Sequence, residues 1–294
     1  MAGNGKNLKV LMIGNSFSIS VGVFLPKIVN VNPEHSLELT NAYIGGCVLE
    51  RHYNNLLEAE KNPDADLYQI NFWAPGETAD YGVSRRGNVN ELLKNNQYDI
   101  ISIQQGSVHS WRPECCEPYA GEIIKYIRQY QKNAEIIIQQ TWAYRSDSPH
   151  FAEFGIGQYE MYEKARDAYK ELAERYQLRM IPTGDAVELF RARTPVKYQA
   201  PVRQVKYPEE APGTAGDVVG CSFWQKDENG EYKLVTDTIH LNDAGQFMQA
   251  ALWFAFLFDE PALKAAPAFP DISENNDADL ILQCVQDALD GSKK

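Results

Sequence analysis

Short apolar runs alternate along the chain with longer stretches of helical periodicity. The runs at residues 9–13, 37–44, 99–103, 135–139 and 178–182 have the length and composition of strands, although 37–44 is more mixed. Apolar residues between them recur every three or four positions, as in helices with one buried face. Such alternation predicts parallel strands joined by crossover helices, and so a three-layer α/β/α domain with a parallel sheet.

Four apolar stripes have clear helical spacing. They are Ile123, Ile124, Ile127 and Tyr130; Tyr162, Ala165, Tyr169, Leu172, Ala173 and Tyr176; Ala244, Phe247, Met248, Ala251, Leu252 and Ala255; and Ala278, Ile281, Leu282, Val285 and Leu289. Asn242 or Asp243 is placed to cap the third stripe. We assign residues 1–258 to one domain and residues 259–294 to a helical C-terminal extension packed on it.

Two long segments interrupt this pattern. Residues 54–90 are expected to form a long loop or a small hairpin, and residues 194–220, rich in Pro, Gly and Val, a long loop. Loops of this length in a compact domain are often functional. Residues 221–224 and 232–235 then flank an Asn-Gly pair, which predicts a β-hairpin.

The composition and net charge of the chain limit the classes of molecule that it is expected to bind. The chain has 294 residues, 44% of them apolar, and a formal net charge of -12. An acidic surface repels nucleic acid and anionic membranes, and no apolar run reaches the roughly 18 residues of a membrane span. We expect a small-molecule or carbohydrate ester as substrate, and no prediction is made of the oligomeric state. The short, polar, basic start at residues 1–9 predicts a cytoplasmic protein, or a secreted or periplasmic one if a leader has been removed.

Cysteines and histidines indicate no cofactor. The five cysteines have spacings that fit neither a disulfide framework nor a zinc site, which favours free thiols in a reducing compartment. The five histidines lack paired ligand spacing, and no Gly-rich phosphate loop follows the first strand. We therefore expect neither a metal nor a nucleotide cofactor.

Two short motifs carry candidate chemistry. Gly14-Asn15-Ser16-Phe17-Ser18 follows the first strand, where an open parallel sheet places its sites, although alone such a triplet is more often a turn with a helix cap. Asp237-Thr238-Ile239-His240 precedes the third helical stripe. A serine nucleophile needs a base, and the base needs a carboxylate to fix its tautomer. His240 and Asp237 can supply both.

The two motifs together resemble the SGNH (GDSL-type) hydrolase superfamily over roughly residues 8–258. In that superfamily the serine block comes first in the chain and the Asp-x-x-His block last, as Ser16 and the pair Asp237 and His240 do here. The GNSFS-type start and IHLN-type end are most similar to a bacterial subgroup thought to act on carbohydrate esters. This resemblance implies a flavodoxin-like SGNH hydrolase fold and a Ser16–His240–Asp237 triad.

The resemblance also implies an oxyanion hole. The main chain of Ser16 supplies one donor, and Gly46, with Gly45 as the alternative, supplies another from the glycine block after the second strand. The superfamily takes a third donor from an Asn after the next strand, but this chain has Gln104 and Gln105 there. A glutamine amide carries the same donor on a longer arm. We assign the role to Gln105, or to Gln104 as the alternative.

Other residues are candidates for binding the substrate. Gln104, Trp142 and His52 lie near predicted strand ends or the glycine block, and Trp142 is placed to stack on a sugar ring unless it is a core or rim aromatic.

The favoured hypothesis is a serine esterase for short acyl esters, such as O-acetyl groups on carbohydrate. The alternative is a carbohydrate-binding protein on an SGNH scaffold with little or no catalysis, motivated by the absent Asn and by the 16 tyrosines and 5 tryptophans.

Overall fold

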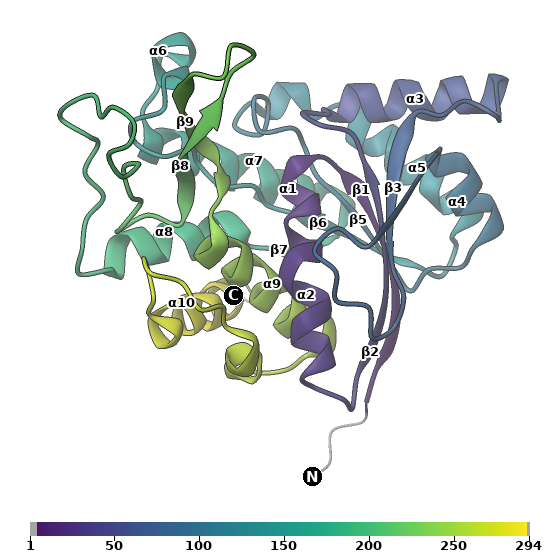
Figure 1. Cartoon of the computed structure of the whole chain (residues 1–294). Coiled ribbons are helices and arrows are strands. Elements are labelled where there is room, and N and C mark those ends of the chain that lie inside the picture. The colour runs from purple at the N-terminus through teal and green to yellow at the C-terminus, as the bar shows by residue number, and fades with distance from the viewer. Residues whose placement is uncertain (1–4, 293–294) are drawn as a thin grey trace.

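The computed structural model describes residues 5–292, with a central sheet between two layers of helices (Figure 1). The sheet strands are β1 (Asn7–Gly14), β2 (Ser36–Tyr43), β3 (Tyr68–Trp73), β4 (Val83–Gly87), β5 (Ile100–Ile103), β6 (Glu135–Gln139) and β7 (Arg179–Ile181). Their order is β4-β3-β2-β1-β5-β6-β7, and β3 alone runs opposite to the others, so it pairs antiparallel with both β2 and β4. The predicted three-layer α/β fold is confirmed.

Strand β1 shows why the apolar runs form the middle of the sheet. Its residues alternate between two cores, with Val10 and Met12 in one and Leu11 and Ile13 in the other. Side chains of a strand point alternately to opposite faces, so a strand covered on both sides must be apolar throughout. The flanking strands β2 and β5 pair with β1 in register, Ile13 lying beside both Ala42 and Ile103.

Helices cover both faces of the sheet (Figure 1). One core is formed with α2 (Val21–Asn30), α8 (Thr183–Arg193), α9 (Asp243–Phe258) and α10 (Ala278–Ser292). The other is formed with α3 (Leu49–Lys61), α4 (Val89–Asn95) and α5 (Tyr119–Tyr130), and α7 (Gln158–Tyr176) contributes to both. The shorter helices are α1 (Ser16–Ile19), α6 (His150–Phe154), η1 (Pro113–Cys115) and η2 (Ala262–Ala268).

Helix α9 is the centre of the first core. Fourteen of its 16 residues are buried, because α2, α8, α10 and η2 surround it. Helix α10 packs its apolar stripe, including Ile281, Val285 and Leu289, into the same core. No helix in residues 5–292 has the length and apolar character needed to cross a membrane.

In the segment 54–90 the small-hairpin alternative is confirmed, since β3 and β4 pair antiparallel, and the long-loop alternative is wrong. After the end of α3 the segment forms β3 and β4, which join the edge of the central sheet by antiparallel pairing, so the sheet is not purely parallel. Polar residues within β3 make this strand difficult to recognise from the sequence. Asn71 is fully buried in β3, where its Nδ2 donates to Tyr81 O (2.9 Å) and Ser84 Oγ (3.0 Å).

The predicted hairpin is present and longer than expected. Strands β8 (Val219–Lys226) and β9 (Tyr232–Leu241) form a separate two-stranded sheet, and Gly230 has the positive φ (82°) that its turn requires. The ladder is irregular near its base, where Val219 pairs with Leu241 and Cys221 with Asp237. Gly220 alone therefore lies opposite residues 238–240. This bulge bends β9 where its candidate catalytic residues lie.

We predict that Gly22→Ala destabilises the protein by about 1–3 kcal/mol. An alanine inside a helix usually stabilises it by about 1 kcal/mol relative to glycine. At Gly22 the added Cβ would lie 2.3 Å from Cζ2 of Trp73, which is itself buried, so α2 or the indole must shift. The measurement is the free energy of unfolding in urea.

Gly291→Ala is the matched control, because nothing lies within 4 Å of a Cβ at this position in α10. It should be neutral or slightly stabilising. Equal effects of the two substitutions would contradict the packing argument.

Candidate active site

Ser16 lies at the junction of β1 and α1, at the carboxyl edge of the sheet. The preceding residue, Asn15, caps α1, and its Oδ1 accepts a hydrogen bond from Phe17 N (3.0 Å). Asn15 and Phe17 are buried and Ser16 is half-buried. The turn therefore fixes the backbone on both sides of Ser16 while leaving its hydroxyl accessible.

The bulge in β9 brings Asp237 and His240 to this serine. His240 Nε2 lies 2.8 Å from Ser16 Oγ, and His240 Nδ1 lies 2.6 Å from Asp237 Oδ2. The second oxygen of Asp237 accepts from the backbone N–H groups of Ile239 (2.7 Å) and His240 (3.0 Å). A carboxylate, an imidazole and a hydroxyl are thus joined in series by hydrogen bonds.

The carboxyl group of Asp237 is held in its charged form. Burial raises its pKa, but the hydrogen bond from the His240 ring and those from the two backbone N–H groups outweigh burial, and the net pKa lies well below its usual range. Asp237 therefore stays ionised in neutral and mildly acidic medium. An ionised carboxylate at Nδ1 keeps a proton on that nitrogen, so Nε2 faces Ser16 as the acceptor.

Trp142 is a buried core residue next to the site, so the prediction that it stacks on a sugar is wrong. It is 1% exposed, its ring stacks on Phe17 at 3.9 Å, and its Nε1 donates to Ile239 O (2.8 Å). The rings of Phe17 and His240 pack edge to face, with 5.8 Å between their centroids. The tryptophan therefore joins the serine turn to the histidine bulge as a core residue.

The prediction of Gln104 as an oxyanion donor or substrate ligand is also wrong. Gln104 is 2% exposed, its Nε2 donates to Asn15 Oδ1 (2.8 Å), and its Oε1 accepts from Gln139 Nε2 (2.7 Å). Gln139 also donates to Phe17 O (3.0 Å). We call Asn15, Gln104, Gln139 and Gln249 the amide chain.

The amide chain ends on α9. Gln249 Nε2 donates to Gln139 Oε1 (3.2 Å) and to Phe17 O (2.8 Å), and its Oε1 accepts from Ser20 Oγ (2.6 Å). The members are all at most 2% exposed. A buried amide must find partners, so this chain fixes the strand ends and α9 relative to the Ser16 turn.

Gln105, the preferred third oxyanion donor, is excluded by its contacts. It is 1% exposed, and its Oε1 accepts from the backbone N–H groups of Leu49 (2.9 Å) and Gly106 (2.8 Å). Its Nε2 donates to Cys115 O (2.9 Å). The side chain instead joins the start of α3 to the loop at η1.

Gly46, the predicted oxyanion donor, lies in a turn that is hydrogen-bonded to the Ser16 turn. Gly45 and Gly46 form an exposed turn after β2, and Gly46 has a φ of 62°, which a side chain would disfavour. The next carbonyl, Cys47 O, accepts from Asn15 Nδ2 (2.9 Å). Asn15 therefore joins this turn to the Ser16 turn. The N–H of Gly46 makes no hydrogen bond to any other described residue.

His52 does not reach the cleft, contrary to the prediction that it binds substrate. It is 1% exposed, and its Nδ1 lies 3.0 Å from Tyr68 Oη, with the two rings stacked at 5.7 Å. Burial lowers the pKa of His52 from 6.5 to about 3. The ring is therefore a neutral core residue between α3 and β3.

Two residues near the site were missed from the sequence. Ser107 Oγ lies 2.8 Å from Tyr144 Oη, and Ser107 is only half-buried. Ser107 follows Gln104 and Gln105 in the loop after β5, where the superfamily has its oxyanion Asn. Its position in that loop could have identified it as a candidate from the sequence. Tyr144 follows β6, but nothing in the sequence pairs it with Ser107.

A buried arginine supports the base of the bulge. Arg145 N donates to Thr238 O (2.8 Å), and its guanidinium pairs with Asp147 (Nε–Oδ1 2.7 Å). Gly220 has a φ of 89°, and a Cβ there would lie 2.6 Å from both Arg145 Nη1 and Asp237 O. Only glycine fits opposite the bulge, because both the backbone angle and the space demand it.

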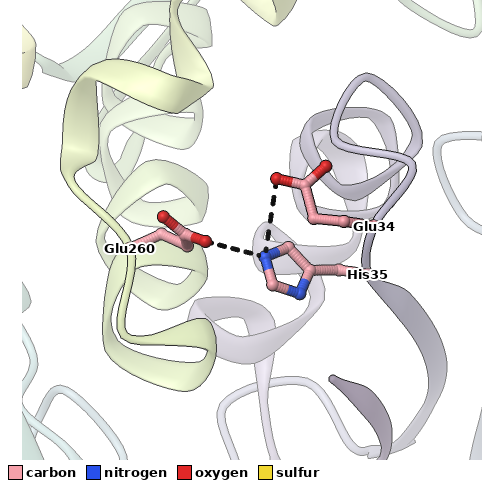
Figure 2. A group of neighbouring side chains, drawn as sticks. All are labelled: Glu34, His35 and Glu260. Carbon is pink, nitrogen blue, oxygen red and sulfur yellow. Dashed lines mark hydrogen bonds and ion pairs between the residues drawn. The ribbon is translucent and has the colours of Figure 1, made fainter. Parts of the chain in front are cut away.

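Within the described chain, one group of side chains has the spacing of a metal site (Figure 2). His35 Nε2 lies 3.1 Å from Glu260 Oε1 and 4.0 Å from Glu34 Oε1. Its Nδ1 accepts from Lys6 N (3.1 Å), so the proton of the neutral ring sits on Nε2 and is donated to Glu260. Lys264 Nζ already lies 2.7 Å from Glu34 and 3.0 Å from Glu260. The group fits a hydrogen-bonded ion pair better than a metal ligand set.

A cavity of about 930 Å³ lies at the β7 edge of the sheet, away from the serine. Its walls come from α7, β7, α9 and α10 and include Arg179, Phe256 and Gln286. None of Ser16, Asp237 and His240 lines it, and it holds no comparable set of nucleophile and base. We therefore assign the chemistry to the Ser16 site.

The profile of a protein family, Domain of unknown function (DUF4886), matches residues 9–199. A solved DUF4886 family protein from Bacteroides uniformis is 24% identical, with a TM-score of 0.73 over 98% of this chain and 96% of that chain. At that identity the likeness shows the fold alone.

A protein described provisionally as an SGNH hydrolase, from Slackia heliotrinireducens, is 16% identical, with a TM-score of 0.48 over 90% of this chain and 99% of that one. An acetyl xylan esterase is 14% identical, with a TM-score of 0.46 over 85% of this chain and 100% of that one. Likenesses this weak carry no argument here. No curated protein matches the chain.

The buried histidine generates a prediction about stability and pH. The folded protein keeps His52 neutral down to about pH 3, whereas the unfolded chain takes up the proton below about 6.5. Between these values unfolding binds a proton, so stability falls as the pH falls. We expect His52→Phe, which keeps a ring against Tyr68, to flatten the dependence of the melting temperature on pH between 7.5 and 4.

Tyr68→Phe is the control for this experiment, because it removes the hydrogen bond and keeps the imidazole. It should lower the melting temperature and preserve the slope against pH. If His52→Phe and the unaltered protein lose stability equally on acidification, His52 is not the group responsible.

Proposed function

This chain belongs to the DUF4886 family, and we propose that it is a serine ester hydrolase. Ser16 is the nucleophile, His240 the general base and then general acid, and Asp237 the carboxylate that orients the imidazole. The observation that carries the proposal is the unbroken pair of hydrogen bonds, 2.8 Å from Ser16 to His240 and 2.6 Å from His240 to Asp237. A structural serine has no need of a base that is itself held by an ionised acid.

The first half of the reaction transfers the acyl group to the enzyme. Ser16 Oγ attacks the carbonyl carbon of the ester while its proton passes to His240 Nε2. The negative charge that develops on the carbonyl oxygen is stabilised by the N–H groups of Ser16 and Gly46. His240 then gives its proton to the leaving alkoxide, the carbon–oxygen bond breaks, and the alcohol departs.

The second half returns the enzyme to its starting state. Water takes the place of the alcohol, His240 Nε2 removes a proton from it, and the hydroxide attacks the acyl group on Ser16. The carboxylic acid leaves as Ser16 regains its proton from His240. Throughout, Asp237 stabilises the charged imidazole without taking up a proton itself.

The proposed substrate is a short acyl ester, with an O-acetyl group on carbohydrate as the first choice. This choice rests on the similarity of the GNSFS- and IHLN-type motifs to those of the bacterial SGNH subgroup. The half-buried Ser16 is consistent with an ester carried on a bulky alcohol.

The direct test is hydrolysis of p-nitrophenyl acetate. We expect Ser16→Ala to remove at least about 1,000-fold of kcat, because acylation needs the hydroxyl. A fluorophosphonate probe should label the unaltered protein at Ser16 and leave Ser16→Ala unlabelled.

Ser222→Ala is the matched control, because its hydroxyl is hydrogen-bonded within residues 5–292 only to Thr236 on the hairpin (3.3 Å) and is not part of the proposed triad. It should retain full activity and labelling. Equal rates in Ser16→Ala and the unaltered protein would remove Ser16 from the role of nucleophile. Saccharide binding with no labelling at Ser16 would favour a binding protein.

The charge on Asp237 generates a second prediction. Because its pKa is held well below the usual range, the Asp237 carboxylate takes up no proton as the medium becomes mildly acidic. We expect kcat/KM to fall on the acid side with a logarithmic slope of about one, as for one proton. Asp237→Asn should lower kcat by about 10,000-fold, since an amide no longer fixes the working tautomer. A slope near two would show that a second group titrates.

A further inference from the structure

The proposed hydrolase lacks a side-chain donor for its oxyanion. The amides of Gln104 and Gln105 are both engaged elsewhere, which leaves the backbone N–H groups of Ser16 and Gly46. A tetrahedral intermediate of acyl transfer is stabilised by donors aimed at its oxygen, and removing one donor costs about 100- to 1,000-fold in rate. A hydroxyl or amide with a free proton at the rim of the site would supply such a donor.

Ser107 lies beside the glycine turn that holds Gly46. The residue before it, Gly106, packs its backbone directly on this turn, and a Cβ on Gly106 would lie 2.9 Å from Cys47 O and 2.8 Å from Val48 Cγ1. The same carbonyl, Cys47 O, accepts the hydrogen bond from Asn15. Ser107 is therefore only one residue away from a contact shared by the Ser16 turn and the Gly46 turn.

The partner of Ser107 lies near the acid of the site. Tyr144 is fully buried, and its neighbour Arg145 is hydrogen-bonded to Thr238 O beside Asp237. Burial raises the pKa of Tyr144 and the nearby charge of Asp237 adds to this effect, whereas the hydrogen bond with Ser107 lowers it. The Ser107–Tyr144 hydrogen bond of 2.8 Å thus links the loop that packs on Cys47 to the segment that contacts β9 beside Asp237.

The direction of this hydrogen bond follows from counting protons. The phenol of Tyr144 keeps its proton, and Ser107 Oγ is its sole hydrogen-bond partner among residues 5–292. The arrangement that satisfies both hydroxyls has Tyr144 Oη donating and Ser107 Oγ accepting, because the buried phenol has no other described partner. The proton of Ser107, which is only half-buried, is then free to point elsewhere. A hydroxyl that accepts a hydrogen bond is also a stronger donor.

We propose that Ser107 supplies the third oxyanion donor, in place of the asparagine amide, and that Tyr144 is the positioning residue that orients and polarises it. The inference rests on the proposed esterase function. Ser107 Oγ–H donates to the carbonyl oxygen as it gains negative charge in each tetrahedral intermediate. No proton is transferred from Ser107, and no bond to it forms or breaks.

The test compares Ser107→Ala, Ser107→Asn and Tyr144→Phe in the full-length protein with p-nitrophenyl acetate. Ser107→Ala should lower kcat by about 100- to 1,000-fold with KM changed less than about threefold, because the donor acts on the developing charge. Ser107→Asn restores an amide donor and should recover part of the loss. Tyr144→Phe should lower kcat by about tenfold, since the serine hydroxyl remains but is no longer oriented.

Labelling by a fluorophosphonate gives a second readout, because its phosphoryl oxygen needs the same donors. Ser107→Ala should slow labelling of Ser16 in parallel with kcat, while melting temperatures report any loss of folding. Tyr119→Phe is the matched control, since this tyrosine contacts Glu50 (2.8 Å) on the surface. It should leave kcat unchanged.

The outcomes separate this inference from the proposed function. If Ser16→Ala abolishes hydrolysis while a folded Ser107→Ala keeps the kcat of the unaltered protein, Ser107 is not a donor and the esterase function stands. A rise in KM at constant kcat would likewise overturn the inference, because it would assign Ser107 to substrate binding. If the unaltered protein shows no Ser16-dependent hydrolysis, the function and the inference both fail.

Discussion

Buried amides that must find partners impose the tightest constraint on this molecule. The chain of hydrogen bonds from Asn15 through Gln104 and Gln139 to Gln249 crosses the ends of β1, β5 and β6 and finishes on α9. An amide left unpaired in such a place costs roughly 1–3 kcal/mol, so each member restricts its neighbours. The carbonyl of Phe17 accepts from two of them, which fixes the turn that presents Ser16. The geometry of the proposed nucleophile is therefore set by buried polar residues.

The other half of the site depends on an irregularity in a two-stranded ribbon. A regular strand would send Asp237 and His240 to opposite faces, because they are three residues apart. The bulge opposite Gly220 and the backbone hydrogen bonds accepted by Asp237 turn both side chains toward Ser16 instead. Trp142 then joins the two halves by packing on Phe17 and bonding to Ile239.

Local patterns in the sequence were sufficient for the parallel strands, and the serine and histidine motifs became informative only in combination. The apolar runs identify β1, β5 and β6 because a strand covered on both sides has no polar alternative, and the spacing of Asp237 and His240 is a property of a few adjacent residues. The hairpin of β3 and β4 was predicted only as an alternative to a loop, and its place in the central sheet was missed, because β3 contains the buried polar residue Asn71. Gln105, Trp142 and His52 were misassigned for a related reason: each stands near a strand or turn of the site, but its direction is decided by residues far away in the chain. The backbone N–H of Leu49 donates to the side-chain oxygen of Gln105, and the ring of His52 is hydrogen-bonded to Tyr68 Oη. Ser107 and Tyr144 escaped notice because neither is informative without the other.

The hydrogen bond between Ser16 and His240 joins residues that are 224 positions apart. At a synthesis rate of about 5–20 residues per second, roughly 10 to 45 seconds separate the emergence of the two residues from the ribosome. Helix α9, which carries the last member of the amide chain, follows His240. A growing polypeptide therefore carries Ser16 without its hydrogen-bonded partner until residue 240 has been made and α9 has docked. Under the proposed function, the onset of ester hydrolysis would serve as a clock for the co-translational docking of α9.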